Sequence, residues 1–260
     1  MSSITFLGTG PGSPVKGKFS SSCLLRAPSA TVLVDAGEPC SLTLCNLGVR
    51  VSDLDAVLIT HGHSDHTAGL PMLLQAAWLE KRLCPLPVFL PDELIEPLKA
   101  WLGAVFLPDK LLGFPLEFRP WNAGRSEEVA PGVEVEPFPT THLDGLRRII
   151  EPGASRRFKT FGLDVRCGGK RAVFSSDLGT PLDLDAALGA PCDVLVCELS
   201  HYEPEELFAF LRGREIGVLA LNHFSPGLAG REQEIAEMAA RELPGVGRVV
   251  AVRDGDVLEL

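Results

Sequence analysis

Residues 54–71 read LDAVLITHGHSDHTAGLP and contain the pattern that decides the fold. A β-prone apolar run comes first and ends in the hexapeptide HGHSDH. Alternate side chains at a strand end point to one side, so His61 and His63 can share one metal ion, while Asp65 and His66 on the following turn can face a second ion. A polar loop with incidental histidines is the alternative interpretation, because short motifs do produce false matches.

Three further residues at predicted strand ends can complete this metal site. His142 in FPTTHLDG, Asp177 in RAVFSSDLG and His223 in LNHFSPG each follow an apolar, strand-like run. The ends of separate strands can converge on one edge of a sandwich of two sheets. A lone histidine in such a place is more often a turn residue than a ligand, but the first cluster needs partners, which favours the metal site.

The composition is that of an ordinary globular protein. The chain has 260 residues, of which 45% are hydrophobic and 22% charged, and its formal net charge is −10. This acidic balance argues against a broad surface for nucleic acid but leaves a local basic patch open. The cysteines are odd in number and lack Cys-x-x-Cys spacing, as in a reduced, cytoplasmic protein. No apolar run reaches the roughly 18 residues that span a bilayer, so no membrane association is expected.

The order of the predicted elements indicates a layered α/β architecture. Short β-prone runs recur along the chain, and residues 66–83, 92–106, 204–213 and 231–244 have helical patterns. Strands arrive first as a block and then alternate with helices, and this order recurs in the second half. We therefore predict one domain over residues 1–260, with two sheets packed together and helices on the outside.

The HGHSDH run, followed in order by a histidine, an SSD aspartate and a C-terminal histidine, resembles the metallo-β-lactamase superfamily over essentially the whole chain. The resemblance implies an α/β fold of four layers, the αββα metallo-β-lactamase fold sandwich. It also implies two divalent metal ions. By this resemblance the first ion is bound by His61, His63 and His142, the second by Asp65, His66 and His223, and Asp177 bridges the two.

The physical logic of such a site supports hydrolysis. Two dications close together need an anionic bridge, and a carboxylate provides one oxygen to each. Neutral imidazoles leave enough positive charge to acidify a bound water and to polarise the oxygen under attack. Histidine and carboxylate ligands suit zinc, although manganese and iron are compatible. We expect Asp65 to act in catalysis as well as in metal binding.

Several motifs narrow the branch of the superfamily. A bridging Asp177 disfavours the true β-lactamases, and the lack of an acidic residue at His63 disfavours the di-iron redox branch. FLGTGPGSP, VDAG, LNHFSP and RDGDVLEL together resemble the ribonuclease Z-like branch, whose members are phosphodiesterases. The glycines of FLGTGPGSP match neither a dinucleotide fingerprint nor a P-loop, and we interpret them as a tight turn that brings backbone close to the metals.

A sixth histidine is a candidate proton donor. His201 lies 22 residues before His223, where it resembles the histidine thought to protonate the leaving oxygen in ribonuclease Z-like enzymes. Glu198, three residues earlier at the end of the run DVLVCEL, could orient or charge that imidazole. The alternative is a surface histidine that caps the helix beginning with PEEL.

A basic segment cuts across the acidic balance. GLRRIIEPGASRRFKTFG runs between His142 and Asp177, and we interpret it as a hairpin loop over the active site. Guanidinium groups suit phosphate, although a charged hairpin is often just solvated. The candidate substrate-binding residues are Arg147, Arg148, Arg156, Arg157 and Lys159.

Together these features predict a dinuclear, metal-dependent phosphodiesterase that acts on a small anionic phosphodiester such as a cyclic nucleotide. The long exosite arm with which ribonuclease Z grips transfer RNA has no counterpart, which disfavours the alternative of a tRNA 3′-end endonuclease, although RNA stays open as a partner. The same ligands would also be compatible with a lactone or thioester hydrolase, or with a non-catalytic metal-binding scaffold. The branch resemblance also implies a homodimer.

Overall fold

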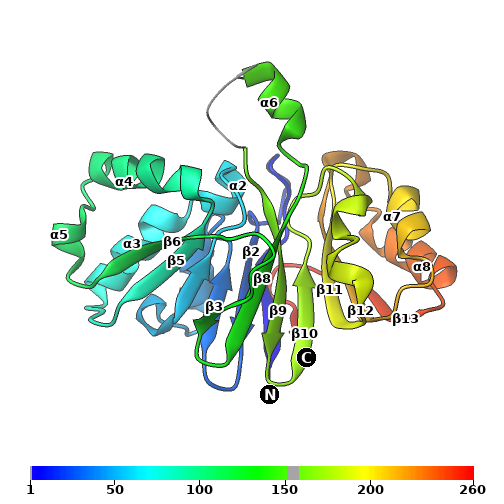
Figure 1. Ribbon diagram of the computed structural model, residues 1–260, viewed down its shortest axis with the longest axis horizontal. Helices are drawn as coiled ribbons and strands as arrows, with labels where there is room; N and C mark the ends of the chain where they lie inside the picture. The colour runs from blue at the N-terminus through cyan, green and yellow to red at the C-terminus, as the bar shows by residue number, and fades with distance from the viewer. Residues whose placement is uncertain (1, 151–157) are drawn as a thin grey trace.

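The computed structural model describes residues 2–150 and 158–260. Within these residues the strands form two mixed sheets of seven strands each. The sheets face each other, and helices cover their outer sides (Figure 1). This helix, sheet, sheet, helix order confirms the predicted four-layer α/β sandwich. None of the described helices is long and apolar enough to cross a membrane.

The first sheet combines the N-terminal strands with the last strand of the chain. Its N-terminal part is antiparallel, and the pairs from β3 to β6 are parallel. In spatial order it comprises β14 (Val257–Glu259), β1 (Ser3–Gly8), β2 (Ser22–Arg26), β3 (Thr31–Val34), β4 (Ala56–Leu58), β5 (Leu86–Leu90) and β6 (Leu116–Pro120).

The second sheet repeats this plan with antiparallel strands first and parallel strands last. The pairs from β7 to β10 are antiparallel and those from β10 to β13 are parallel. In spatial order it comprises β13 (Val246–Ala251), β12 (Ile216–Phe224), β11 (Cys192–Leu199), β10 (Lys170–Phe174), β9 (Phe161–Cys167), β8 (Val133–Pro139) and β7 (Glu127–Ala130).

Most helices flank the sheets, whereas α6 rises above them at the centre (Figure 1). The α-helices are α1 (Cys40–Asn46), α2 (Ser64–Thr67), α3 (Leu70–Leu79), α4 (Ile95–Ala104), α5 (Asp109–Leu112), α6 (Asp144–Ile150), α7 (Pro204–Leu211) and α8 (Glu232–Glu242). Short 3-10 turns are η1 (Val51–Asp53), η2 (Asp92–Leu94), η3 (Pro181–Leu184), η4 (Ala187–Gly189) and η5 (Pro226–Leu228).

Three apolar clusters hold the layers together. The central one lies between the sheets and includes Phe6, Val135 and Val196. The outer ones pack α1, α3 and α4 on the first sheet and α7 and α8 on the second. The inner parallel strands β4 and β11 are covered on both faces and are almost wholly buried, whereas the parallel edge strands β6 and β13 are more exposed.

Two predicted elements differ from the structure. Residues 66–83 are not one helix: α2 ends at Thr67 and α3 begins at Leu70, because the Gly69 N–H donates to the Ala36 carbonyl instead of continuing a helix. The basic segment predicted as a hairpin loop begins with α6, whose leucine, arginine and isoleucine residues support a short helix. Residues 151–157 of that segment lie outside the described residues.

Candidate metal centre

The candidate ligands gather where strands end at one edge of the two sheets. His61 and His63 follow β4, His142 follows β8 and Asp177 follows β10. His223 lies near the end of β12, and its ring reaches the same edge. In chain order the strands are far apart, but the carboxyl ends of β4, β8, β10 and β12 meet at this edge. The structure therefore brings all seven sequence-predicted ligands together, in two groups that share Asp177.

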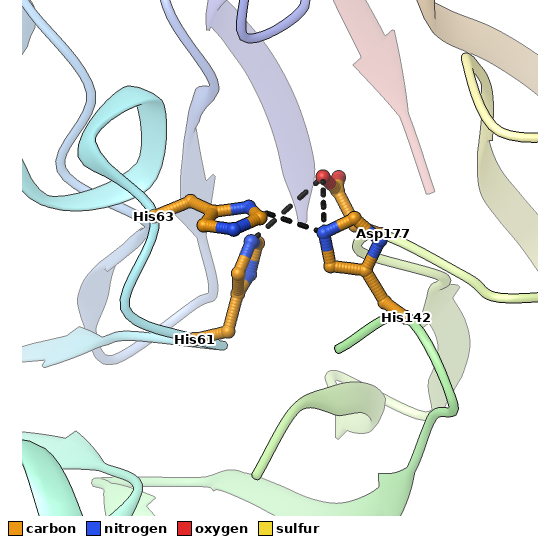
Figure 2. A group of neighbouring side chains, drawn as sticks. All are labelled: His61, His63, His142 and Asp177. Atoms are coloured by element: carbon orange, nitrogen blue, oxygen red, sulfur yellow. Dashed lines mark hydrogen bonds and ion pairs between the residues drawn. The ribbon is translucent and has the colours of Figure 1, made fainter. Parts of the chain in front are cut away.

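The first group consists of three histidines and one carboxylate oxygen, drawn in Figure 2. His61 Nε2 lies 3.8 Å and His142 Nε2 lies 3.6 Å from Asp177 Oδ2. His63 Nδ1 and His142 Nε2 face each other at 3.1 Å. With bonds near 2.1 Å, two ligands of a tetrahedral ion stand about 3.4 Å apart, so this spacing suits a shared metal ion.

The second group faces the other oxygen of Asp177. His66 Nε2 lies 3.3 Å and His223 Nε2 lies 3.4 Å from Asp177 Oδ1. The same two nitrogens lie 3.4 Å and 3.7 Å from Asp65 Oδ2. Each oxygen of Asp177 thus serves one group, which is the arrangement that a bridging carboxylate needs.

Hydrogen bonds fix the histidine rings in the orientation that ligands require. His66 donates Nδ1–H to Asp35 Oδ2 at 2.7 Å, so its Nε2 lone pair faces the second group. Thr60 donates its hydroxyl to Asp35, so its oxygen is left to accept from His61 Nδ1 at 3.1 Å. His223 Nδ1 pairs with the Ser21 hydroxyl at 2.8 Å. Both His61 Nε2 and His66 Nε2 are buried and lack a hydrogen-bond partner among the described residues.

The pKa values show that these groups suit cations. Burial lowers the pKa of His61 well below its ordinary value and that of His142 to about 4, so both rings are neutral ligands at pH 7. Burial opposes charge on Asp177, but His223 and His66 outweigh it and hold its pKa well below the usual range. Burial also opposes charge on His66, yet Asp177 and Asp35 raise its pKa well above its ordinary value. A metal ion can replace the proton that this negative potential attracts to His66, so the residues present fit a dinuclear metal site.

Backbone conformations near the site are unusual. Asp35, Ser176 and His223 have positive φ angles of 57°, 52° and 49°. Such angles are rare outside glycine and cluster at functional sites, where the surrounding structure holds them. Each of these residues either belongs to a ligand group or adjoins one.

His201 lies beside the first group, as predicted for a proton donor. Its Nδ1–H donates to Glu198 Oε1 at 2.8 Å, and its Nε2 lies 4.0 Å from Asp177 Oδ2. Burial lowers the pKa of His201, but Glu198 and Asp177 more than compensate, so the pKa lies above its ordinary value. The alternative of a helix cap does not hold, because Glu203 caps α7 in a capping box with Glu206.

The predicted substrate-binding residues are only partly brought to the site. Arg147 and Arg148 are on α6, which rises above the sheets at the centre of the molecule (Figure 1) and begins two residues after His142. Lys159 pairs with Asp92 at 2.8 Å, so its charge is compensated. Arg156 and Arg157 lie outside the described residues.

Sequence reasoning missed the residues that orient the ligands. Asp35 belongs to the VDAG motif and Ser21 to the serine run at residues 20–22, but no signal in the sequence assigns them to His66 and His223. Their contacts span 31 and 202 positions along the chain, so only the folded sheets reveal them.

The fold and the two groups of ligands define a domain of one known superfamily. The sequence profile of the beta-lactamase superfamily domain matches residues 30–246, and the chain belongs to this superfamily. A curated relative, ribonuclease Z of Mycobacterium bovis (strain BCG / Pasteur 1173P2), is 28% identical over 278 residues, and the match covers 94% of each chain. This similarity places the chain in the ribonuclease Z-like branch.

Solved structures show the same fold. The metallo-beta-lactamase fold protein YhfI from Bacillus subtilis superimposes with a TM-score of 0.77 at 20% identity, over 99% of this chain and 98% of that one. A diphosphatase from the PhnP family gives a TM-score of 0.72 at 17% identity, over 100% and 98%. The short form of human tRNase Z gives 0.71 at 20% identity, over 99% and 98%.

Proposed function

We propose that the protein is a dinuclear metal-dependent phosphodiesterase that acts on a small phosphodiester such as a cyclic nucleotide. The observation that carries the proposal is the position of Asp177. Its two oxygens face two separate ligand groups, and His201 lies within 4.0 Å of one of them. Similarity to ribonuclease Z supports phosphodiester chemistry.

The residues would divide the work as follows. His61, His63 and His142 hold one ion, Asp65, His66 and His223 hold the other, and Asp177 belongs to both. When bound, the ions supply an activated water and polarise the phosphate. His201 donates the proton on Nε2 to the leaving oxygen, and Glu198 keeps that imidazole oriented and protonated. Asp65 is a catalytic residue through its place in the second group.

The proposed ions are zinc, with manganese or iron as alternatives that the same ligands accept. We also propose that residues 1–260 form one domain. The shared core between the sheets supports this, as does β14, which returns from the C-terminus to pair with β1. A homodimer remains a proposal that follows from the ribonuclease Z-like branch.

The proposed size of the substrate rests on the elements that lie between His66 and His142 in the sequence. The described residues between His66 and His142 form α3, β5, α4, α5, β6, β7 and β8, which belong to the body of the fold. These described residues offer no long arm for a folded RNA, so a small or single-stranded phosphodiester suits the chain better. Arg147 and Arg148 of α6 are proposed to attract the anionic substrate, with Arg156, Arg157 and Lys159 beside them in sequence.

Two alternatives are compatible with the site, and one of them has a specific observation in its favour. A tRNA 3′-end endonuclease is favoured by the curated relative, whose name is ribonuclease Z. A lactone or thioester hydrolase could use the same two ligand groups, but it would need neither His201 as a proton donor nor a cationic rim.

One panel of substrates tests these proposals. Zinc- and manganese-reconstituted protein would be incubated with 3′,5′- and 2′,3′-cyclic nucleotides, precursor tRNA, a lactone and a thioester. Asp65→Ala serves as the blank. We expect turnover of cyclic nucleotides and none of precursor tRNA. Cleavage of the lactone or thioester alone would overturn the phosphodiesterase proposal and the role of His201.

A further inference from the structure

A concave surface lies beside the metal centre. None of the proposed metal ligands is among its described lining residues. It measures about 320 Å³, within the range of pockets that bind small molecules. A single loop between β1 and β2 forms most of it, and the segment before α1 closes it. The pocket is lined by residues 10–15, 18–20, 38 and 39.

Gly12 joins this pocket to the metal centre. A Cβ atom on Gly12 would lie 3.5 Å from Asp65 Oδ2, so the loop backbone passes beside that carboxylate. A Cβ atom on Gly10 would lie 2.8 Å from the Phe19 carbonyl oxygen, closer than side chains allow, so the two stems of the loop can approach only through glycine. The glycines predicted to form a tight turn thus belong to a longer loop, residues 9–21, which does bring backbone close to a proposed ligand, Asp65.

The chemistry of the lining suits a flat, uncharged ring. Pro11, Pro14, Val15 and Pro39 are apolar, and Phe19 keeps 43% of its surface exposed. Lys18 is the one cationic residue among the described lining residues. It pairs with Glu232 at 2.8 Å, so its charge is compensated. Glu38 is also among the lining residues, and its negative charge disfavours a phosphate group in this pocket. Aromatic side chains stack on nucleobases of any sequence, which makes Phe19 a natural platform.

The carboxylate of Asp254, far from this loop in sequence, fixes the wall of the pocket. Asp254 Oδ1 accepts from the backbone N–H and the hydroxyl of Thr9, at 2.8 Å and 2.7 Å. Asp254 Oδ2 accepts from the Phe19 N–H at 2.6 Å. Thr9 and Phe19 stand at the two stems of the loop, and Gly10 N–H donates to the Phe19 carbonyl between them. One carboxylate therefore preorganises the platform, which reduces the entropy lost when a ring binds.

We propose that this pocket binds the planar ring carried by a phosphodiester substrate, such as a nucleobase, and that Asp254 is a positioning residue for it. The proposal rests on the phosphodiesterase function proposed above. Phe19 contacts the ring, and Asp254 acts through Phe19 and Thr9. The pocket thus supplies specificity that the metal centre lacks, because the centre faces only the phosphate.

Two esters with the same leaving group isolate the ring: thymidine 5′-(p-nitrophenyl phosphate) and methyl p-nitrophenyl phosphate. For the metal-loaded protein, kcat/KM should favour the thymidine ester about tenfold or more, because a base that stacks on an aromatic side chain binds more tightly. Phe19→Ala should bring this ratio close to one. Phe106→Ala, which removes a phenylalanine that is 83% exposed between α4 and α5, is the matched control and should keep the wild-type ratio.

The role of Asp254 has its own matched pair. In Asp254→Asn the amide must direct an N–H group at one of the backbone donors, so the ratio should fall mainly through a higher KM for the thymidine ester. Asp256→Asn changes a carboxylate in the same turn, which accepts from Arg253 N–H instead, and should keep the ratio.

Calorimetry of product binding separates the two proposals. Wild-type protein should bind thymidine 5′-monophosphate about tenfold more tightly than methyl phosphate, and Phe19→Ala should lose that difference. If neither ester is hydrolysed, the phosphodiesterase function fails while the binding data still judge the pocket. Equal binding of both products, or a ratio that Phe19→Ala leaves unchanged, would overturn the ring-binding pocket.

Discussion

The two ligand groups share Asp177 but differ in what surrounds them. The second group contains the carboxylate of Asp65, and its His66 is braced by a second buried carboxylate, Asp35. The first group contains three histidines, of which His63 and His142 are only partly buried. The second group is therefore more negative and more enclosed, and it should hold its ion more tightly. The first group is the one beside His201, where the proposed substrate would bind.

Removing the shared carboxylate should have the largest effect, because it breaks both groups at once. In Asp177→Asn one oxygen and the negative charge are lost, so we expect metal content to fall from two ions to fewer than one and hydrolysis to fall to background. Metal analysis after gel filtration and steady-state kinetics measure this. An Asp177→Asn protein that keeps two ions and turns over substrate would show that Asp177 does not bridge them.

Removing the proposed proton donor, His201, should leave both ligand groups intact and still cost most of the rate of hydrolysis. His201→Ala should retain two ions and lower kcat on an alkyl phosphodiester about 10²- to 10⁴-fold. A p-nitrophenyl ester should lose far less, because its leaving oxygen needs no proton. Equal losses on both substrates would contradict the role of His201.

Removing the charge of Asp35, which orients His66, tests whether the two ligand groups bind their ions with different affinity. Asp35→Asn should lower the affinity of the second ion about 10- to 100-fold. The affinity of the first ion should fall much less, because Asp35 reaches His61 only through the Thr60 hydroxyl. Competition with a chelator measures both affinities. Ser21→Ala, which removes the neutral partner of His223, is the matched comparison and should have a smaller effect. A uniform loss of both ions in Asp35→Asn would contradict the separate identity of the two groups.

The smallest effect concerns pH. Glu198 raises the pKa of His201, so the protonated donor persists to higher pH than an isolated histidine would allow. Glu198→Gln removes that support, and the alkaline limb of the kcat profile should move to lower pH, with little change on the acid side. A profile of kcat against pH for both proteins measures the shift. Glu205→Gln changes an exposed carboxylate in the first turn of α7 and should leave the profile where it is.

The candidate ligands could be predicted from the sequence because their chemistry is local. HGHSDH places four candidate ligands at one strand end and the turn that follows it. Each of the other three candidates follows an apolar run that forms a strand. The layered fold could be predicted for the same reason, since burial on one or both faces fixes the pattern of each strand. The break between α2 and α3 has a local signal that the helical pattern hides: Pro71 cannot donate to the preceding turn and stands in the first turn of α3. The hydrogen bond from Gly69 to Ala36, a contact with another segment, then holds the break in place.

The sequence by itself determined which residues can hold two ions and that the fold is a layered sandwich of two sheets, since both follow from residue type and spacing. Only the tertiary structure decided how those residues are supported. Asp35 reaches His66, Ser21 reaches His223, and Asp254 reaches Phe19 across 235 positions. The order of strands in the two sheets creates these contacts, and that order depends on how whole layers pack. The glycines of FLGTGPGSP therefore indicate a close approach of backbone to the metal centre, but spacing along the chain does not reveal the contacts that fix the pocket there.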